Sequence, residues 1–410
     1  MKNIPWSLFQ LSVLLILLFQ TSLCGTAQKL ESPTSSSDLQ FVSGQSARRI
    51  PFEFVGNHIY LRARINNSAA LWFFLDSGAT SSYFDVQQAK ALGLEIQAGS
   101  VKVSLNLPGV TLSNQTIPIR TLGFSEYDGH AIEGMLGYNF ISRFVMEIDY
   151  ARKTISLYEP KSYRYSGSGD SIPLIMLEDD SGGKVPLVRA IVAEHGRDAI
   201  EGKFIADTGV RVDLSYNIPF AEKNRMLQST EKTIQVFFGG GAMVKEGKWL
   251  LGRVQSLLLG RFEIDNPMAA LPQDTNTKGV LASPEFDGVI GAEILRRFKV
   301  IFDYSRERMI LEPNKRFSES YEYDMSGMLL VVEGSDSKTI KVRRVIDNSP
   351  AMEIGVHEGD VILNINGKAA AKLTLEQVRQ MFKREGLSYV LSIKRGEQQI
   401  QMKIKMRRLI

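Results

Sequence analysis

The sequence predicts a mainly β protein built from two related, β-barrel-like units followed by a smaller α+β domain. Three observations support this fold class. Short runs of β-branched and aromatic residues, bounded by Asn, Gly and Ser, recur from about residue 50 to about residue 314 and are typical of strands. One segment of the first half returns in the second half. After residue 321 the pattern changes to strands mixed with an amphipathic helix.

The composition is that of an ordinary folded chain and argues against several classes of function. Of 410 residues, 44% are hydrophobic and 23% are charged, and the net charge of +4 is too small to indicate nucleic-acid binding. The single cysteine and four scattered histidines offer no disulfide and no metal-ligand spacing, so we expect neither a metal nor a cofactor. The motifs G-x-S-x-G, G-x-G-x-x-G and Walker A are absent, which disfavours serine-hydrolase, dinucleotide and P-loop chemistry.

The first 27 residues have the pattern of a secretory signal peptide. Lys2 precedes an apolar run from Leu11 to Phe19, and small or polar residues follow as far as Ala27. We expect cleavage after Ala27 and a secreted or periplasmic protein. Two alternatives stay open, because an uncleaved segment would anchor the chain in a membrane and Cys24 could carry a lipid.

The chain is expected to divide into five segments. They are a signal peptide (1–27), a polar linker (28–48), a first β lobe (49–163), a second β lobe (172–315) and a C-terminal domain (321–410). The linker is too poor in large apolar residues to pack. The Gly- and Ser-rich segment 164–171 is expected to be a flexible joint between the lobes.

The internal repeat is clearest between residues 134–150 and 288–304. Without a gap, the two copies share two glycines, an Arg-Phe pair and a closing Asp-Tyr pair. Each copy predicts a buried strand, a short helix and a second strand, so a duplicated β unit is the simplest explanation. The closing acids Asp149 and Asp303 each lie near an arginine, and we expect them to form structural ion pairs.

Upstream of each copy, an acid ends an apolar strand and is followed by a hydroxyl residue and a glycine. The two motifs are Asp76-Ser77-Gly78 and Asp207-Thr208-Gly209. A pseudo-twofold arrangement would bring the two acids together, where they would share a proton and act as general base and general acid on a water and a departing group. The two hydroxyls are expected to hydrogen-bond across the axis, and the two glycines allow close backbone approach.

Together with the downstream segments Met135-Leu-Gly137 and Val289-Ile-Gly291, the doubled motif resembles the retropepsin-type aspartic proteases, here with both lobes in one chain. The resemblance covers about residues 50–315. It implies that Asp76 and Asp207 form the catalytic pair, that water is the nucleophile, and that polypeptide substrates lie extended beneath a flap. Residues 236–244 look like such a flap, with the candidate tip Phe238, Gly239, Gly240 and Gly241; an ordinary hairpin turn is the alternative.

Two features depart from the family pattern. Val210 follows the second motif where a smaller residue is usual, and Arg211 brings a cation nearby. The second lobe also has a longer segment between its aspartate and its repeated glycine. An alternative therefore stays open, in which the protein is a catalytically incompetent peptide-binding scaffold.

The last ninety residues resemble a PDZ domain in the elements Ser349-Pro-Ala, Gly355, Gly359-Asp360 and Ile365-Asn-Gly367. A helix capped by Thr374 and Gln377 is expected to follow them. The resemblance implies that a peptide strand adds beside an edge strand and that backbone N–H groups bind its C-terminal carboxylate. By position, the peptide-binding residues would be Ser326, Gly327, Met328, Leu329 and Val378. The alternative is a module that only packs on the lobes or joins subunits.

Overall fold

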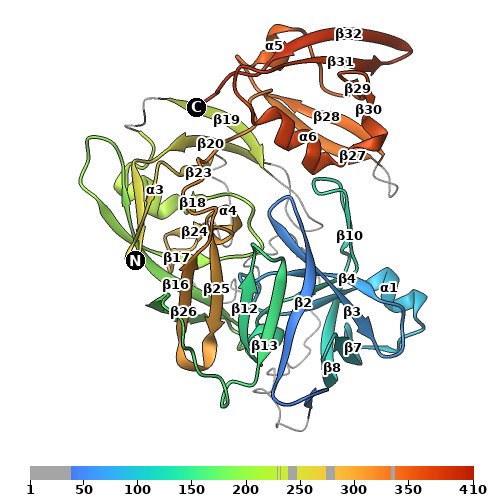
Figure 1. Cartoon of the computed structure of the whole chain (residues 1–410), viewed down its shortest axis with the longest axis vertical. Helices are drawn as coiled ribbons and strands as arrows, with labels where there is room; N and C mark the ends of the chain where they lie inside the picture. Colours follow the sequence, from blue (N-terminus) through green and yellow to red (C-terminus); the bar gives the residue numbers. More distant parts are fainter. Residues whose placement is uncertain (1–37, 229, 231, 239–246, 274–281, 334–337) are drawn as a thin grey trace, which may run out of the picture.

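The computed structural model describes residues 38–228, 230, 232–238, 247–273, 282–333 and 338–410. The expected signal peptide, Cys24, the first part of the linker and the candidate flap residues 239–241 lie outside this part of the chain. Among the described residues, no helix is long and apolar enough to cross a membrane. Figure 1 shows a first lobe in blue to green, a second lobe in green to orange, and a C-terminal domain in orange to red.

The first lobe is a strongly bent, mostly antiparallel sheet. Its central strands are β2, β3 and β4, and β3 also pairs with β7, which curls the sheet toward a barrel. Its elements are β1 (Leu39–Phe41), β2 (Ser46–Val55), β3 (His58–Ile65), β4 (Leu71–Leu75), β5 (Tyr83–Asp85), α1 (Val86–Ala91), β6 (Ile96–Gln97), β7 (Ser100–Leu107), β8 (Val110–Arg120), β9 (Gly123–Ser125), β10 (His130–Ile132), β11 (Gly134–Leu136), α2 (Tyr138–Ile141), β12 (Val145–Asp149) and β13 (Thr154–Tyr158).

The second lobe repeats this plan with β16 in the place of β3 and β17 in the place of β4. Its elements are β14 (Asp170–Pro173), β15 (Ile175–Glu178), β16 (Lys184–Ala193), β17 (Ile200–Ala206), β18 (Leu214–Tyr216), α3 (Ile218–Asn224), β19 (Thr233–Phe238), β20 (Gly247–Arg253), β21 (Ser256–Leu259), β22 (Phe262–Asp265), β23 (Met268–Pro272), β24 (Gly288–Ile290), α4 (Ala292–Leu295), β25 (Phe298–Asp303), η3 (Tyr304–Arg306) and β26 (Arg308–Pro313).

The two lobes meet where β12 pairs antiparallel with β25. Val145 lies opposite Asp303 and Asp149 lies opposite Lys299. In the sequence repeat Asp303 is the counterpart of Asp149, and Lys299 is the counterpart of Val145. Exchanging each residue for its counterpart in the repeat therefore gives the same pairing. This shows that a pseudo-twofold axis runs through this strand pair. A continuous apolar core joins the two lobes across it.

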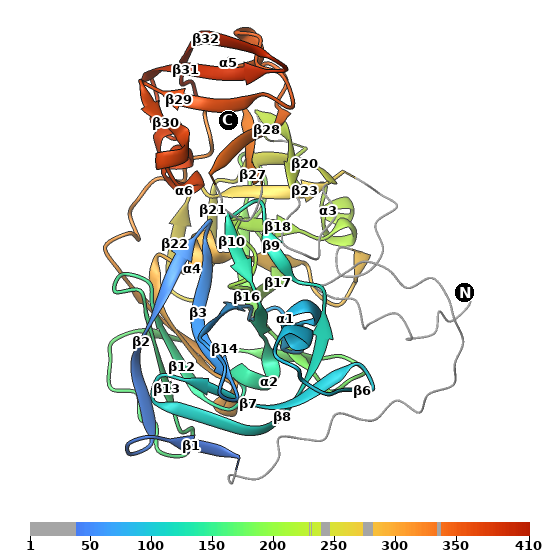
Figure 2. The same ribbon diagram turned by 90° about the vertical axis from the view of Figure 1, so that its right-hand side faces the viewer.

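The C-terminal domain has a separate apolar core and one six-stranded sheet. Its elements are β27 (Met328–Glu333), β28 (Thr339–Val345), α5 (Pro350–Glu353), β29 (Val361–Ile365), β30 (Lys368–Ala369), η4 (Ala370–Lys372), α6 (Leu375–Phe382), β31 (Ser388–Arg395) and β32 (Gln398–Lys405). The predicted capping box is confirmed, since Thr374 and Gln377 exchange hydrogen bonds at the start of α6. Figures 1 and 2 show α6 and β27 on the side of this domain that faces the lobes.

Two expectations about linkers are wrong. From Leu39 onward the polar linker is not loose, because β1 pairs with β8 and the Phe41 ring packs against Phe144. The joint at 164–171 is also anchored, because the Tyr165 hydroxyl bonds to Glu312 at 2.8 Å and accepts the N–H of Gly169 at 2.6 Å. Both segments contain isolated aromatic residues that contact residues far away in the sequence. Local composition does not predict such contacts.

Candidate active site

Two pairs of parallel strands bring Asp76 and Asp207 to the interface between the lobes. β4 runs beside β11, and the N–H of Asp76 donates to the carbonyl of Leu136 at 2.9 Å. In the second lobe β17 runs beside β24, and the N–H of Asp207 donates to Ile290 at 2.9 Å. The apolar segments before Gly137 and Gly291 are thus the strands that hold the two aspartates in place.

The hydroxyl residues of the two motifs bond to each other across the axis, as the sequence predicts. The N–H of Ser77 donates to Oγ1 of Thr208 at 3.0 Å, and the N–H of Thr208 donates to Oγ of Ser77 at 2.9 Å. Each hydroxyl then donates to a carbonyl of the opposite lobe, Ser77 to Ala206 at 2.8 Å and Thr208 to Leu75 at 3.2 Å. These reciprocal bonds hold the two Asp-hydroxyl-Gly loops together.

The glycines of the motifs leave room for the opposite carboxylate. A Cβ added to Gly78 would lie 2.2 Å from Oδ2 of Asp207, and one added to Gly209 would lie 2.4 Å from Cγ of Asp76. Each glycine also donates its N–H to the aspartate of its own motif, at 2.9 Å from Gly78 and 2.6 Å from Gly209. Each carboxyl group therefore sits against the backbone of both loops.

Burial governs the charge state of the pair. Asp76 is 3% exposed and Asp207 is fully buried. Burial, the neighbouring charge of Asp207 and a hydrogen bond to Asp207 raise the pKa of Asp76 well above its ordinary value. Burial also raises the pKa of Asp207, but the N–H of Gly209 and the hydrogen bond to Asp76 oppose this rise. The pair consequently holds one proton over a range of pH.

Two buried tyrosines lie near the pair and come from the repeated Asp-Tyr elements. Burial and the charge of Asp207 raise the pKa of both Tyr150 and Tyr304. Their preceding acids do not join the site. Asp149 pairs with Arg152 at 2.7 Å and Asp303 pairs with Arg306 at 3.1 Å, which confirms the predicted structural ion pairs.

Arg211 contacts the tip of the β9–β10 hairpin. Its Nη2 atom lies 3.1 Å from Oδ1 of Asp128. The other carboxylate oxygen of Asp128 contacts Nδ1 of His58 at 2.8 Å and accepts the hydroxyl of Tyr60 at 2.7 Å. These partners hold the pKa of Asp128 well below its ordinary value despite burial. The sequence does not reveal this cluster, because its members are far apart in the chain.

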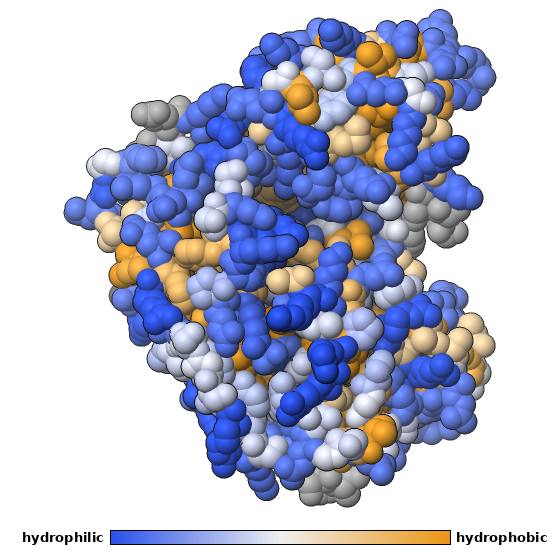
Figure 3. All heavy atoms as spheres, in the orientation of Figure 1, coloured by the Kyte–Doolittle hydropathy of each residue, from blue (hydrophilic) through white to orange (hydrophobic). Residues whose placement is uncertain are grey.

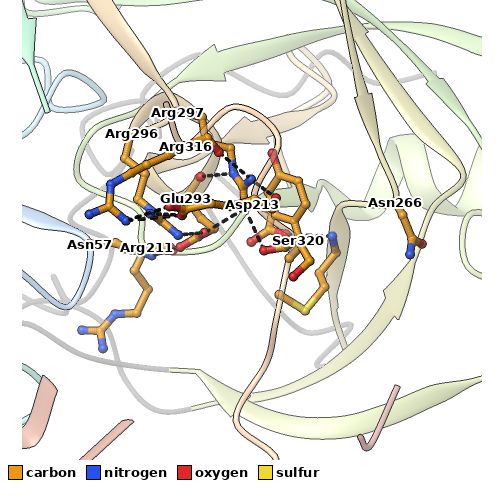
Figure 4. Close-up of polar contacts among 12 residues, drawn as sticks. Asn57, Arg211, Asp213, Asn266, Glu293, Arg296, Arg297, Arg316 and Ser320 are labelled. Atoms are coloured by element: carbon orange, nitrogen blue, oxygen red, sulfur yellow. Dashed lines mark hydrogen bonds and ion pairs between the residues drawn. The ribbon is translucent and has the colours of Figure 1, made fainter. Parts of the chain in front are cut away.

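A second charged cluster surrounds Glu293, close to Arg211 and Asp213 (Figure 4). Glu293 contacts Arg296 and Arg297 and accepts Nδ2 of Asn57 at 2.7 Å. Nearby, burial and the charge of Glu293 raise the pKa of Asp213 to about 7. Within the described part of the chain, no group of three or more His, Cys, Asp or Glu residues is placed to hold a metal ion.

The described residues on either side of the candidate flap tip form paired strands, and the role of a flap stays a prediction. Phe238 pairs with Gly247, and its ring lies 5.8 Å from that of Trp249. In the second lobe β19 and β20 lead to β23, which runs parallel to β18. In the first lobe β6 and β7 lead in the same way to β8 and β5, but their turn is far shorter. Among the described residues, the β19–β20 pair extends over six residue pairs, whereas the β6–β7 pair extends over two.

The predicted peptide-binding residues of the C-terminal domain separate into two sets. Met328 and Leu329 line a cavity between β27, α6 and the two lobes. Val378 does not line it, because its side chain is fully buried in the domain core. On a helix whose apolar face packs inward, the groove side carries Glu376, Arg379, Gln380 and Lys383 instead. The N–H groups of Ser326 and Gly327 already have a partner, Asp324.

Comparisons with known proteins agree with this arrangement. Residues 61–140 match the family model described as aspartyl protease, and residues 325–394 match that of the PDZ domain. The chain therefore contains an aspartyl protease domain and a C-terminal PDZ domain. The first match includes Asp76 and ends before Asp207.

Two curated relatives resemble only part of the chain. Both are named "Probable CtpA-like serine protease". The one from Staphylococcus haemolyticus is 30% identical over 128 residues, which is 31% of this chain and 24% of the relative. The one from Staphylococcus epidermidis is 31% identical over 108 residues, 26% of this chain and 22% of the relative. The chain thus spans about a quarter of their length.

A solved structure, the aspartic proteinase from Irpex lacteus, superimposes with a TM-score of 0.44 at 12% identity. The match covers 67% of this chain and 99% of that one.

Proposed function

We propose that this protein is an aspartic endopeptidase that hydrolyses peptide bonds of polypeptide substrates with the Asp76/Asp207 pair. The observation that carries the proposal is the reciprocal packing of two buried carboxylic acids from matching strand ends, locked by the Ser77 and Thr208 bonds. A pair that holds one proton presents a base and an acid together, which is what water attack on an amide and protonation of the leaving nitrogen require.

The pair divides two roles between its members. One carboxyl group carries the charge and acts as the general base toward water, while the other keeps the shared proton. The protonated group then supplies the proton that the departing amine needs. The aspartyl protease and PDZ matches support hydrolysis and peptide binding in one chain.

The test is hydrolysis of a denatured protein by the purified chain, followed by mass spectrometry of the products. We expect internal cleavage that Asp76→Asn and Asp207→Asn each abolish. Asp149→Asn is the matched control, because this acid is also repeated and buried but bonds to Arg152. Absence of any cleavage by the wild-type chain over a broad pH range would favour the peptide-binding scaffold instead.

A serine protease is the other enzyme class to consider, because the curated relatives carry that name. The sequence has no G-x-S-x-G motif. A serine-directed fluorophosphonate would separate the two classes, since it should leave the activity of an aspartic enzyme intact.

We further propose that the protein is exported and that residues 1–27 are removed. The apolar run from Leu11 to Phe19 and the small residues after it support this. Intact-mass spectrometry of the mature protein should show a chain that begins near Gln28, or a lipid on Cys24. Retention of residues 1–27 would contradict cleavage.

A further inference from the structure

The carboxylate-binding loop of the PDZ domain is already filled by a carboxylate of its own chain. Oδ1 of Asp324 accepts the N–H of Ser326 at 2.9 Å and the N–H of Gly327 at 3.1 Å, together with the Ser326 hydroxyl. The two remaining N–H groups of the loop are also bonded, that of Met328 to Oγ of Ser326 at 3.1 Å and that of Met325 to the carbonyl of Phe382 at 2.9 Å. All four donors from residue 325 to residue 328 thus have partners inside the domain.

A ligand carboxylate would have to displace Asp324 from this loop. Each N–H supplies a single hydrogen, so the loop cannot serve two carboxylates fully. Two negative charges at one loop also repel each other, and the half-buried Asp324 would lose its charge-assisted bonds. The loop is therefore poorly suited to a free C-terminus, contrary to the expectation from the PDZ resemblance.

The edge strand beside this loop still presents its backbone to the groove. Leu330 lies opposite Val342, whose N–H and carbonyl both bond on the far side, to Asp360 and Gly359. The N–H and carbonyl of Leu330 must accordingly face away from β28 and into the groove. The carbonyl of Leu330 accepts a hydrogen bond from Nη2 of Arg379 at 3.0 Å. The Arg379 side chain of α6 therefore reaches across the groove to the edge of β27.

The far end of β27 is fastened to the protease. The N–H of Val332 donates to the carbonyl of Glu126 at 2.8 Å, at the tip of the β9–β10 hairpin. The same tip holds Arg211 through Asp128. This bond comes from a turn residue in the middle of the chain, so Val332 already has a partner without a chain end. The part of the edge that can still pair is limited to Met328–Leu330, where the N–H of Met328 and the carbonyl of Leu330 have the partners named above.

The groove opens into a cavity that the protease helps to line. The cavity has a volume of about 170 Å³, and its walls include Met328 and Leu330 from β27 and Phe237, Phe238 and Leu251 from the β19–β20 hairpin. Its lining also includes Arg211, which lies two residues after the Asp207-Thr208-Gly209 motif. Figure 3 shows a notch between the C-terminal domain and the first lobe on this face of the molecule. A chain segment in the groove would therefore lie against the base of the candidate flap and next to a catalytic loop.

We propose that the PDZ groove binds an extended internal segment of a polypeptide, rich in large apolar side chains, and does not recognise a C-terminal carboxylate. The segment adds as a short strand to β27, and its chain continues past Asp324. The identification of this segment as part of a substrate rests on the proposed endopeptidase function. The groove would then select substrates by a stretch of sequence some distance from the bond that is cut.

The test measures binding separately from cleavage, in the full chain carrying Asp207→Asn. The probes are fluorescein-labelled peptides with four consecutive large apolar residues, each made in three forms. One form ends in the apolar residues as a free acid, one ends in them as an amide, and one continues with four Gly and Ser residues. Fluorescence anisotropy is recorded at pH 8, because burial raises the pKa of Asp324 to about 6 and the group is then ionised.

We expect the three forms to bind within threefold of one another while Asp324 is in place. Asp324→Ala should strengthen binding of the free acid at least tenfold and change binding of the amide by less than threefold, because the loop donors become available. Asp324→Asn serves as a second variant with nearly the same shape, and it should move binding of the free acid in the same direction.

A matched pair of substitutions locates the site. Leu329→Glu places a charge in the cavity and should weaken all three forms at least tenfold, whereas Leu387→Glu alters an exposed leucine of the same domain away from the cavity and should not. A tenfold preference for the free acid in the presence of Asp324 would overturn the proposal. So would failure of every form to bind, or an equal effect of the two leucine substitutions. Loss of proteolytic activity alone would not affect this result, since the tested chain is inactive by design.

Discussion

The two lobes place different polar residues at equivalent positions behind their aspartates. In the first lobe the sixth residue after the aspartate is Ser82, whose hydroxyl donates to Oδ1 of Asn139 at 2.6 Å and accepts the N–H of Gly137 at 3.0 Å. In the second lobe the counterparts of Ser82 and Asn139 are Asp213 and Glu293. Both acids are buried, and both depend on neighbouring donors and cations.

The difference coincides with the attachment of the third domain. The fully buried Arg297 contacts Glu293 and donates to the carbonyls of Arg316, Glu319 and Ser320, in the segment that leads to the PDZ domain. Its guanidinium also lies 3.5 Å from the ring centre of Tyr321. Its counterpart in the first lobe, Arg143, is only half-buried. The neutral pair is sufficient where a lobe only supports its aspartate, and the charged cluster occurs where the lobe also holds another domain.

The strongest test of the symmetry concerns the aspartates themselves. Despite their unequal surroundings, Asp76→Asn and Asp207→Asn should each lower kcat by about a thousandfold or more, and the double variant should be little worse, because the two groups act as one unit. Since both pKa values are raised, wild-type activity should fall on the acid side at a pH above 3.8, the ordinary aspartate value, and on the alkaline side as the pair loses its shared proton. Near-normal turnover by either single variant would disprove a shared mechanism.

The glycines provide the next test of equivalence. Gly78→Ala and Gly209→Ala should each reduce kcat by about a hundredfold or more, because the new methyl group would overlap the opposite carboxyl and misplace it. Gly247→Ala is the control, since its Cβ would meet nothing closer than 3.8 Å. Circular dichroism should show that the folded state survives. If only one of the two motif glycines were sensitive, the loops would not be functionally symmetric.

The polar clusters should differ in their effect on stability. Glu293→Ala leaves the buried Arg297 without its carboxylate and should lower the free energy of unfolding by about 3 kcal/mol. Asn139→Ala removes only neutral hydrogen bonds and should cost about 1 kcal/mol. Urea unfolding measures both values. Equal losses would mean that the charged cluster has no special role in holding the second lobe and its attached segment.

The smallest effect depends on pH. Burial and Glu293 raise the pKa of Asp213 to about 7, while it is ordinary in the unfolded chain, so the folded state binds the proton more tightly. The contribution of Asp213 to stability is therefore present at low pH and is lost as the pH rises from about 4 through about 7. Asp213→Asn should match the wild type near pH 4 and exceed it by about 1–2 kcal/mol at pH 8.

The first lobe supplies the control for this measurement. Ser82→Ala has no titratable group at the equivalent position, so its difference from the wild type should not change between pH 4 and pH 8. Thermal unfolding at both pH values checks the comparison. A pH-independent effect of Asp213→Asn would contradict the raised pKa.

Much of the architecture could be predicted from local patterns. The doubled Asp-hydroxyl-Gly motif, the repeat around Gly137 and Gly291, and the capping box at Thr374 each consist of residues close together in the chain. Short-range spacing reports directly on strand ends, turns and helix starts, because the backbone geometry of these elements involves only a few successive residues. Because the motif and the repeat occur twice, the sequence also predicted that the two aspartates lie together on a pseudo-twofold axis.

The tertiary structure alone decided the contacts between segments that are distant in sequence. Asp128 meets Arg211, Glu293 meets Asn57, and β27 meets the hairpin tip at Glu126. None of these has a local signature, because a charged residue looks the same in the sequence whether it faces water or a partner many residues away. Asp324 is an intermediate case, because its partners are close in the sequence but could not be assigned from it. It directly precedes the loop in the sequence, yet its hydrogen bonds to the loop became evident only when the positions of the loop N–H groups were known.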